Sequence, residues 1–173
     1  MKKQIILISI LVLLSANISW ASLGGSPTGA EENVLKIKAA ENTTALLSES
    51  DYHNVTDGIL IEFNEDLNYS SSVLDDYVKG NISRDDAIYS TISVYVMNIH
   101  TINTVLQVKP SEKFSNYHNY LTLMVTDFQL YLWNLAKFYE TNNSNYALQA
   151  RENYNTSTDN YDKALQERVL NFV

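Results

Sequence analysis

Two histidines and two glutamates are spaced so that they could meet at one height of a helical protein. Counting outward from turns expected near residues 81, 109 and 142 gives four residues the same level: Glu62, His100, His118 and Glu167. Two imidazoles and two carboxylates form a ligand set that zinc or iron could use. Each of the four flanks an apolar seam, however, and the Glu-x-x-His pair of di-iron bundles is absent from the sequence. The pattern therefore favours solvent exposure or hydrogen bonding over metal binding.

The third histidine, His53, differs because it falls on the expected inner stripe of its segment with Thr56 and Leu60. A buried imidazole needs hydrogen-bond partners for its ring nitrogens. We therefore expect His53 to be a hydrogen-bonded residue at one end of the fold.

Tyrosine is the other unusual residue type, with 12 copies in the chain. A buried phenol needs a partner for its hydroxyl, so a core rich in tyrosine is either hydrated or hydrogen-bonded. Five tyrosines fall on expected inner faces: Tyr95, Tyr117, Tyr131, Tyr154 and Tyr161. They either line a cavity for a small amphipathic or aromatic ligand or fill the boundary layer of a narrow bundle. The sequence favours the second interpretation, whereas a cavity among Tyr95, Tyr131 and Tyr154 would favour the first.

The common catalytic and phosphate-binding patterns are absent from the sequence. It contains no Gly-x-Ser-x-Gly, P-loop or His-Glu-x-x-His motif. Two pairs of adjacent carboxylates, 75–76 and 85–86, fall at an expected helix end and an expected helix start. The second pair complements the positive N-terminal end of a helix dipole, which explains it without catalysis. We therefore expect no enzyme activity and no cofactor.

The composition narrows the function further. The chain has 173 residues, a formal net charge of −8 and no cysteine. This length suits one domain, and the lack of cysteine excludes disulfides, thiolate metal sites and cysteine nucleophiles. The acidic balance argues against nucleic acid as a partner. With 5 Gly and 2 Pro there are few turns, which disfavours a sandwich, barrel or Rossmann-type fold.

The first 21 residues have the pattern of a secretory signal peptide. Two lysines precede an apolar run at 5–14, and Ser19 and Ala21 supply the small residues of a cleavage site. We expect cleavage after Ala21, a flexible linker at 22–30 and an exported protein, secreted or at the cell surface. The alternative is a leader retained as a membrane anchor, because its length approaches that of a membrane span.

Asparagine-linked glycosylation is a related expectation. Six Asn-x-Ser/Thr motifs lie beyond the leader, at Asn42, Asn54, Asn68, Asn81, Asn142 and Asn155. This is about twice the number that the composition gives by chance. They are candidate acceptor sites in a host that glycosylates exported proteins, and otherwise they reflect a composition rich in asparagine.

Apolar residues recur at alternating spacings of three and four, which indicates amphipathic helices and which a strand cannot produce. The longest seam is Phe114, Tyr117, Leu121, Met124, Phe128, Tyr131, Leu135 and Phe138. A second is Ile88, Ile92, Tyr95, Ile99, Ile102 and Leu106, and a third is Leu60, Phe63, Leu67, Leu74 and Tyr77. A last helix, running towards Arg168, has an inner face of Ala147, Ala150, Tyr154, Ser157, Tyr161 and Ala164. Its small residues would let it lie close to a neighbouring helix.

The sequence also indicates where the helices begin and end. Gly80 ends one helix, Ser83 and Asp86 resemble a capping box for the next, and Pro110 cannot lie inside a helix. Short connections between long helices make consecutive helices antiparallel. The sequence thus predicts an all-α protein, an up-down antiparallel four-helix bundle over 51–173. The preceding segment, 31–50, is expected to form an extra helix, and a partly ordered lead-in is the alternative.

Three phrases carry a resemblance to known proteins: 80–87 (GNISRDDA), 109–114 (KPSEKF) and 117–121 (YHNYL). In these the chain resembles uncharacterised exported helical-bundle proteins and lipoproteins of methanogenic archaea and Gram-positive bacteria. The resemblance covers the bundle, implies a helical exported domain and brings no catalytic residues with it. The chain departs from the lipoprotein members because it lacks their lipid-bearing cysteine.

These observations predict an exported, non-enzymatic helical bundle that acts as a cell-surface or secreted interaction module. Its partner would be an unknown protein or another component of the cell envelope, with membrane contact only through a retained leader. The alternative is an extracellular bundle that binds or senses a small molecule in its tyrosine-lined interior. A third possibility is a metal-binding bundle that uses the layer of histidine and glutamate.

Overall fold

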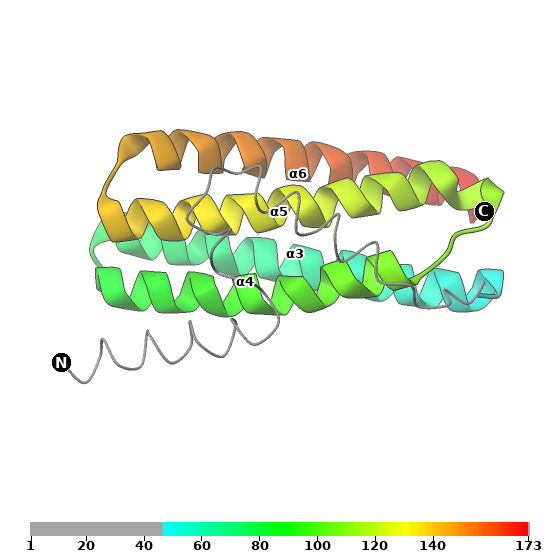
Figure 1. The fold of residues 1–173 in the computed structure, drawn as a ribbon, viewed down its shortest axis with the longest axis horizontal. Helices are drawn as coiled ribbons and strands as arrows, with labels where there is room; N and C mark the ends of the chain where they lie inside the picture. Colours follow the sequence, from blue (N-terminus) through cyan, green and yellow to red (C-terminus); the bar gives the residue numbers. More distant parts are fainter. Residues whose placement is uncertain (1–46, 173) are drawn as a thin grey trace, which may run out of the picture. The chain divides into compact units, whose positions relative to one another are not determined.

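A computed structural model of the chain describes residues 47–172. Four helices make up this part: α3 (Glu49–Lys79), α4 (Arg84–Gln107), α5 (Ser115–Thr141) and α6 (Ser144–Asn171). A short 3-10 turn, η2 (Glu112–Phe114), precedes α5. Successive helices run in opposite directions and pack side by side (Figure 1). The predicted all-α fold, an up-down antiparallel four-helix bundle, is confirmed for these residues.

Several predictions concern residues outside the described part of the chain. They are the leader at 1–21 with cleavage after Ala21, the linker at 22–30, Asn42 and most of the segment 31–50. Where this segment is described, Leu47 and Ser48 are non-helical, and α3 begins at Glu49, two residues before the expected start of the bundle.

The ends of the helices follow the local chemistry of the sequence. The Ser83 hydroxyl accepts a hydrogen bond of 3.2 Å from the Asp86 backbone N–H, which caps α4 as predicted. Gly80 ends α3 with φ 75°, the left-handed conformation that glycine adopts without strain. Asn142 ends α5 in the same conformation, with φ 54°, which asparagine tolerates better than most residues. Each of these ends lets the chain reverse direction within a few residues.

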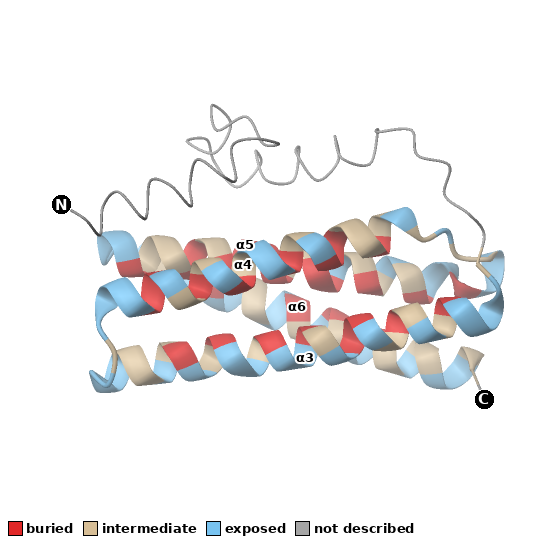
Figure 2. Cartoon of the chain, turned by 90° about the horizontal axis from the view of Figure 1, so that it is seen from below, coloured by how far each residue is buried: buried red, intermediate tan, exposed pale blue. Residues whose placement is uncertain are grey.

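Helix α5 is the central element of the core. Its predicted seam is buried from Phe114 to Leu135, and Phe138 at the far end is half-buried. The helix packs closely against α4 on one side and α6 on the other. In Figure 2 the buried residues of the four helices lie mostly on the sides that face the other helices, and the exposed residues lie mostly on the outside. A continuous apolar stripe along α5 thus organises the other three helices.

Helix α4 is rotated relative to the predicted seam. Four of the six expected seam residues are only half-buried: Ile92, Tyr95, Ile99 and Leu106. The buried face lies one position earlier, at Ala87, Thr91, Val94, Asn98, Thr101 and Val105. The amide of Asn98 supplies a reason, because its Nδ2 donates to the Val125 carbonyl at 3.0 Å and to Gln129 Oε1 at 2.7 Å. A buried amide with hydrogen-bond partners lets a polar residue take a core position.

Helix α6 lies close to α5 because its inner face is built from small residues. Ala150 and Ala164 are buried, and the Ser157 hydroxyl donates a hydrogen bond of 2.9 Å to the Met124 carbonyl. Helices α3 and α6 approach each other mainly through larger side chains, such as the stacked rings of Phe63 and Tyr161. The bundle is therefore tight between α5 and α6 and wider between α6 and α3.

The outer faces of the helices are exposed (Figure 2), and most of their exposed residues are polar, although several large apolar side chains are exposed as well. Within residues 47–172, no helix combines the length and the apolar composition that crossing a membrane would require.

A buried carboxylate lies in the middle of α3. Asp66 is 8% exposed, on the same helix face as Phe63, Ser70 and Val73. Its pKa is raised from the ordinary 3.8 to about 6, chiefly by burial and also by the nearby carboxylates of Glu62 and Glu65. At neutral pH the Asp66 carboxylate is therefore charged while buried in the folded state, whereas water would solvate it fully in the unfolded chain.

We predict that Asp66→Asn stabilises the protein at neutral pH, by about 2 kcal/mol. Because the pKa of Asp66 is higher in the folded state, wild-type stability falls as pH rises from about 4 to about 6 and stays lower above that range. The Asn variant should lose this part of the pH dependence. Urea unfolding across this pH range measures both effects, with Asp159→Asn on the exposed face of α6 as the control. Parallel pH profiles of wild type and Asp66→Asn would contradict the prediction.

Candidate functional site

A groove opens on the wider side of the bundle, between α3 and α6, with α5 as its floor. It encloses about 320 Å³ and is called here the tyrosine groove. Its described lining consists of Ser71 and Leu74 from α3, Tyr131, Leu135 and Phe138 from α5, and Ala147, Ala150, Arg151 and Tyr154 from α6. The volume falls within the range of small-molecule binding sites, and the lining is almost entirely apolar or aromatic.

The local sequence of α6 explains why the groove is there. Ala147 and Ala150 place only methyl groups on the α6 wall, so space remains above the side chains of α5. Tyr154, one turn further on, meets Tyr131 edge to face, with 5.5 Å between the ring centroids. Alternation of alanine and tyrosine along one helix face thus produces a hollow with an aromatic end wall.

The floor residue Tyr131 also carries a polar group, its hydroxyl. Its side chain is 3% exposed, and burial raises the pKa of its hydroxyl above the ordinary value of 10.0. Hydrogen bonding to Ser70 and Ser71 lowers this pKa but does not outweigh burial. The hydroxyl therefore stays protonated at neutral pH and is suited to hydrogen bonding, not to proton abstraction.

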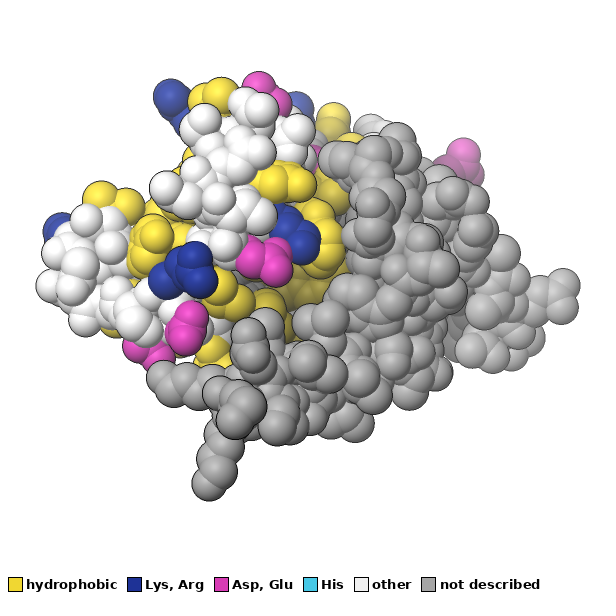
Figure 3. Space-filling model, turned by 60° about the vertical axis from the view of Figure 1, so that its left-hand side comes forward, with side chains coloured by type: hydrophobic (Ala, Val, Ile, Leu, Met, Phe, Trp, Pro, Cys, Tyr) yellow, Lys and Arg dark blue, Asp and Glu magenta, His cyan; other side chains and the backbone are white. Residues whose placement is uncertain are grey.

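Towards the end of the bundle that carries the α3–α4 and α5–α6 connections, hydrophobic side chains reach the surface between polar ones (Figure 3). Basic and acidic side chains lie next to this apolar surface in the same view. Arg151 is the one charged residue among the described residues that line the tyrosine groove. The groove therefore combines an apolar interior with a cation at its edge.

The five predicted tyrosines do not form one site. Tyr131 and Tyr154 line the tyrosine groove, whereas Tyr161 lines a second hollow nearer the C-terminal end of α6. Tyr117 is fully buried, and Tyr95 lies against Trp133 with 6.2 Å between their rings. Of the three tyrosines whose shared cavity would favour ligand binding, Tyr131 and Tyr154 line the tyrosine groove and Tyr95 does not. Tyr95 is excluded because α4 is rotated by one position.

Two further tyrosines, which the sequence pattern did not single out, are buried. Tyr52 and Tyr139 are 2% and 0% exposed, and burial raises the pKa of both hydroxyls. Among the described residues, the hydroxyls of Tyr117 and Tyr139 have no hydrogen-bond partner. Tyr139 directly follows the seam residue Phe138 and lies off the spacing of three and four that marks the seam of α5. The apolar periodicity therefore gave little indication that Tyr139 is buried.

The predicted layer of two histidines and two glutamates is not brought together. His118 Nδ1 lies 3.2 Å from the Tyr52 hydroxyl, and Glu167 Oε2 accepts a hydrogen bond from Asn171. His100 is exposed and Glu62 is half-buried. Within residues 47–172, no group of three or more histidine, aspartate or glutamate side chains lies close enough to hold a metal ion. Equal height along the bundle did not place the four side chains on facing surfaces.

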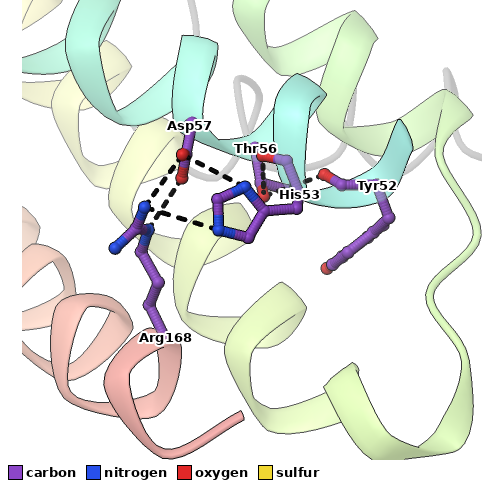
Figure 4. A network of polar contacts seen from close by, with 5 residues as sticks. All are labelled: Tyr52, His53, Thr56, Asp57 and Arg168. Atoms are coloured by element: carbon purple, nitrogen blue, oxygen red, sulfur yellow. Dashed lines mark hydrogen bonds and ion pairs between the residues drawn. The ribbon is translucent and has the colours of Figure 1, made fainter. Parts of the chain in front are cut away.

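His53 occupies the role predicted for it, in a cluster that joins α3 to α6 (Figure 4). Arg168 donates from Nε and from one terminal nitrogen to the two carboxylate oxygens of Asp57, at 2.7 and 2.8 Å. His53 lies beside this pair, with Nδ1 3.2 Å from Asp57 and Nε2 3.5 Å from Arg168. We call these three residues the α3–α6 clasp. Hydrogen bonds from Arg168 lower the pKa of Asp57 below 3.8, despite partial burial.

Aromatic rings close the same end of the bundle. Phe172 stacks on Phe114 with 4.5 Å between ring centroids, and Phe114 stacks on Tyr52 at 5.1 Å. The His53 ring meets Phe172 edge to face at 4.4 Å. These contacts fix the C-terminal end of α6 against η2 and the start of α3, next to the clasp.

Five of the six glycosylation motifs lie in the described part of the chain. Their asparagines are all exposed: Asn54, Asn68, Asn81, Asn142 and Asn155. Asn81 donates from Nδ2 to Asp76 at 3.0 Å, and Asn142 forms the left-handed end of α5. Exposure makes these side chains accessible, and their glycosylation stays a prediction.

We predict that the ion pair between Asp57 and Arg168 in the α3–α6 clasp contributes a coupling energy of about 1 kcal/mol to the free energy of unfolding. The pair has two hydrogen bonds, but about one third of each side chain is exposed, which limits the contribution. A double-mutant cycle of Asp57→Asn and Arg168→Gln measures this coupling through urea unfolding. Because the folded-state pKa of Asp57 is lowered, the coupling is present above the ordinary pKa and is lost as pH falls below it. The exposed Asp75–Lys79 pair is the control and should show a smaller value. Equal coupling in both pairs would show that the clasp has no special role.

Comparison of the chain with protein-family models, with curated proteins and with solved structures found no match. The resemblance to exported helical-bundle proteins of methanogenic archaea and Gram-positive bacteria therefore stays a prediction. What the tyrosine groove can bind follows from its own geometry.

Proposed function

We propose that the protein is an exported, non-enzymatic binding module that takes a small apolar or amphipathic molecule into the tyrosine groove. The observation that carries this proposal is the hollow of about 320 Å³ lined by Tyr131 and Tyr154. The sequence placed a surface interaction module first and a ligand-binding bundle second. A cavity among Tyr95, Tyr131 and Tyr154 was the feature expected to favour the second. The groove favours it through Tyr131 and Tyr154, while Tyr95 lies against Trp133 instead.

The chemistry of the groove suits binding better than catalysis. Its described lining contains no histidine and no carboxylate, so it offers neither a general base nor an acidic metal ligand. The hydroxyl of Tyr131 stays protonated at neutral pH because burial raises its pKa. In the α3–α6 clasp, Asp57 and Arg168 are already paired with each other. Each of these groups can position a ligand or a helix, and none is free to move a proton.

The walls of the groove are well suited to hold a fixed shape. All its described residues lie on long helices, and the Tyr131–Tyr154 contact supports the floor against the α6 wall. A site built on packed helices is ordered before the ligand arrives, so binding loses less conformational entropy than it would in a loop.

We predict that Ala147→Phe fills the groove and weakens binding of a neutral aromatic alcohol, 4-phenylbutanol, by about tenfold. This is the loss expected when one aromatic ring can no longer be buried. Titration followed by amide NMR shifts measures the affinity and locates the site, with the largest shifts expected at Ser71, Ala147 and Arg151.

The matched control is Gln149→Phe, which adds the same ring to an exposed position of the same helix. It should leave both the affinity and the shift pattern unchanged. No saturable shifts in the wild type, or equal affinity in Ala147→Phe, would refute the proposed function.

A second candidate function, binding of a protein partner, is favoured by an apolar surface elsewhere on the same side. Ile61, Val169 and Leu170 are 61%, 59% and 77% exposed. Two shallow hollows lie next to each other on this surface, and Leu165 lines both. Ile61 lines one of them, and Val169 and Leu170 line the other. Large side chains exposed together are typical of protein-binding surfaces.

We predict that Leu170→Glu abolishes capture of such a partner, because it places a charge on the apolar surface at its most exposed residue. Crosslinking of the tagged full chain in its own cells, followed by mass spectrometry, measures this. Leu148→Glu, a change at an exposed leucine outside this surface, is the control. A partner captured equally by both variants does not use this surface.

A further inference from the structure

The cation at the edge of the tyrosine groove is not engaged by the protein. Lys79 pairs with Asp75, Lys137 with Glu140 and Arg168 with Asp57. Arg151, by contrast, forms no hydrogen bond or ion pair with any residue of the described part of the chain. Its guanidinium is exposed next to an apolar floor, so its donors are available to a ligand seated there.

We infer that the tyrosine groove selects an amphipathic anion, an arylalkyl carboxylate whose ring enters the groove and whose carboxylate pairs with Arg151. This inference rests on the proposed binding function and names its ligand class. Arginine presents two parallel N–H donors that match the two oxygens of a carboxylate. A ring suits the other end of the ligand, because Tyr131, Phe138 and Tyr154 offer edges and faces for aromatic contacts.

The acidic residues near this position do not oppose a bound carboxylate strongly. Asp75 follows the lining residue Leu74, and Lys79 already neutralises it. Glu152 follows Arg151 directly, and successive residues of a helix point about 100° apart, away from the groove. The local charge at the groove edge is therefore positive, although the whole chain carries a net charge of −8.

The test compares three probes with the same aromatic body: 4-phenylbutyrate, 4-phenylbutanol and 4-phenylbutylamine. Calorimetric titration of the full chain should show the carboxylate binding about fivefold more tightly than the alcohol and the amine binding most weakly. Arg151→Gln keeps most of the side-chain stem and removes the charge. It should remove the advantage of the carboxylate, so that this variant binds the carboxylate and the alcohol with the same affinity.

Lys163→Gln is the matched control, since Lys163 lies on the same helix, outside the groove and over the ring of Tyr120. It removes the same charge and should leave the preference for the carboxylate intact. Equal binding of carboxylate and alcohol to the wild type would overturn the inference while leaving the proposed function standing. The same preference in Arg151→Gln would assign it to another cation and also overturn the inference. If none of the three probes binds, the proposed function itself fails.

Discussion

The close packing of α6 on α5 is the constraint on which the rest of the bundle depends. Ala150, Ser157 and Ala164 bring the two backbones together, and the hydrogen bond from Ser157 to the Met124 carbonyl fixes their register. A helix with small side chains on its inner face cannot also fill the space towards α3. That space is filled in part by large rings, such as Phe63 and Tyr161, and where the alanines continue it stays open as the tyrosine groove.

No loop joins α3 to α6, so side chains alone must set the distance between them. The α3–α6 clasp does this at one end, where Arg168 spans to both oxygens of Asp57, and the rings of Phe172 and Phe114 close the gap behind it. At the other end, the short α3–α4 and α5–α6 connections tie each helix to its neighbour. The groove lies between two fixed ends, which gives a binding site its preorganisation.

The fold could be predicted from local signals, because caps, prolines and apolar spacing act within a few residues. The rotation of α4 could not, since Asn98 is acceptable in the core only through Val125 and Gln129 on another helix. The metal hypothesis failed for a related reason: counting from turns gives the height of His100 and His118 but not the direction in which each side chain points. Of the groove, Tyr131 and Tyr154 were predictable from their periodicity, whereas Arg151, a single charge on a polar helix, had no pattern to reveal it.

The acidity of the chain bears on how an anion could be selected at all. At long range an anion experiences the net charge of the whole protein, −8, which repels it. The electrostatic field of the protein therefore does not speed the association of an anion. Attraction by Arg151 acts only over the last few ångströms, once the apolar body of the ligand has reached the groove. Preference for a carboxylate must then arise in the rate of dissociation, where a hydrogen-bonded guanidinium holds the bound molecule. An acidic surface with one unpaired arginine at an apolar hollow discriminates against anions that lack an apolar body, because these gain nothing from the groove to offset the repulsion.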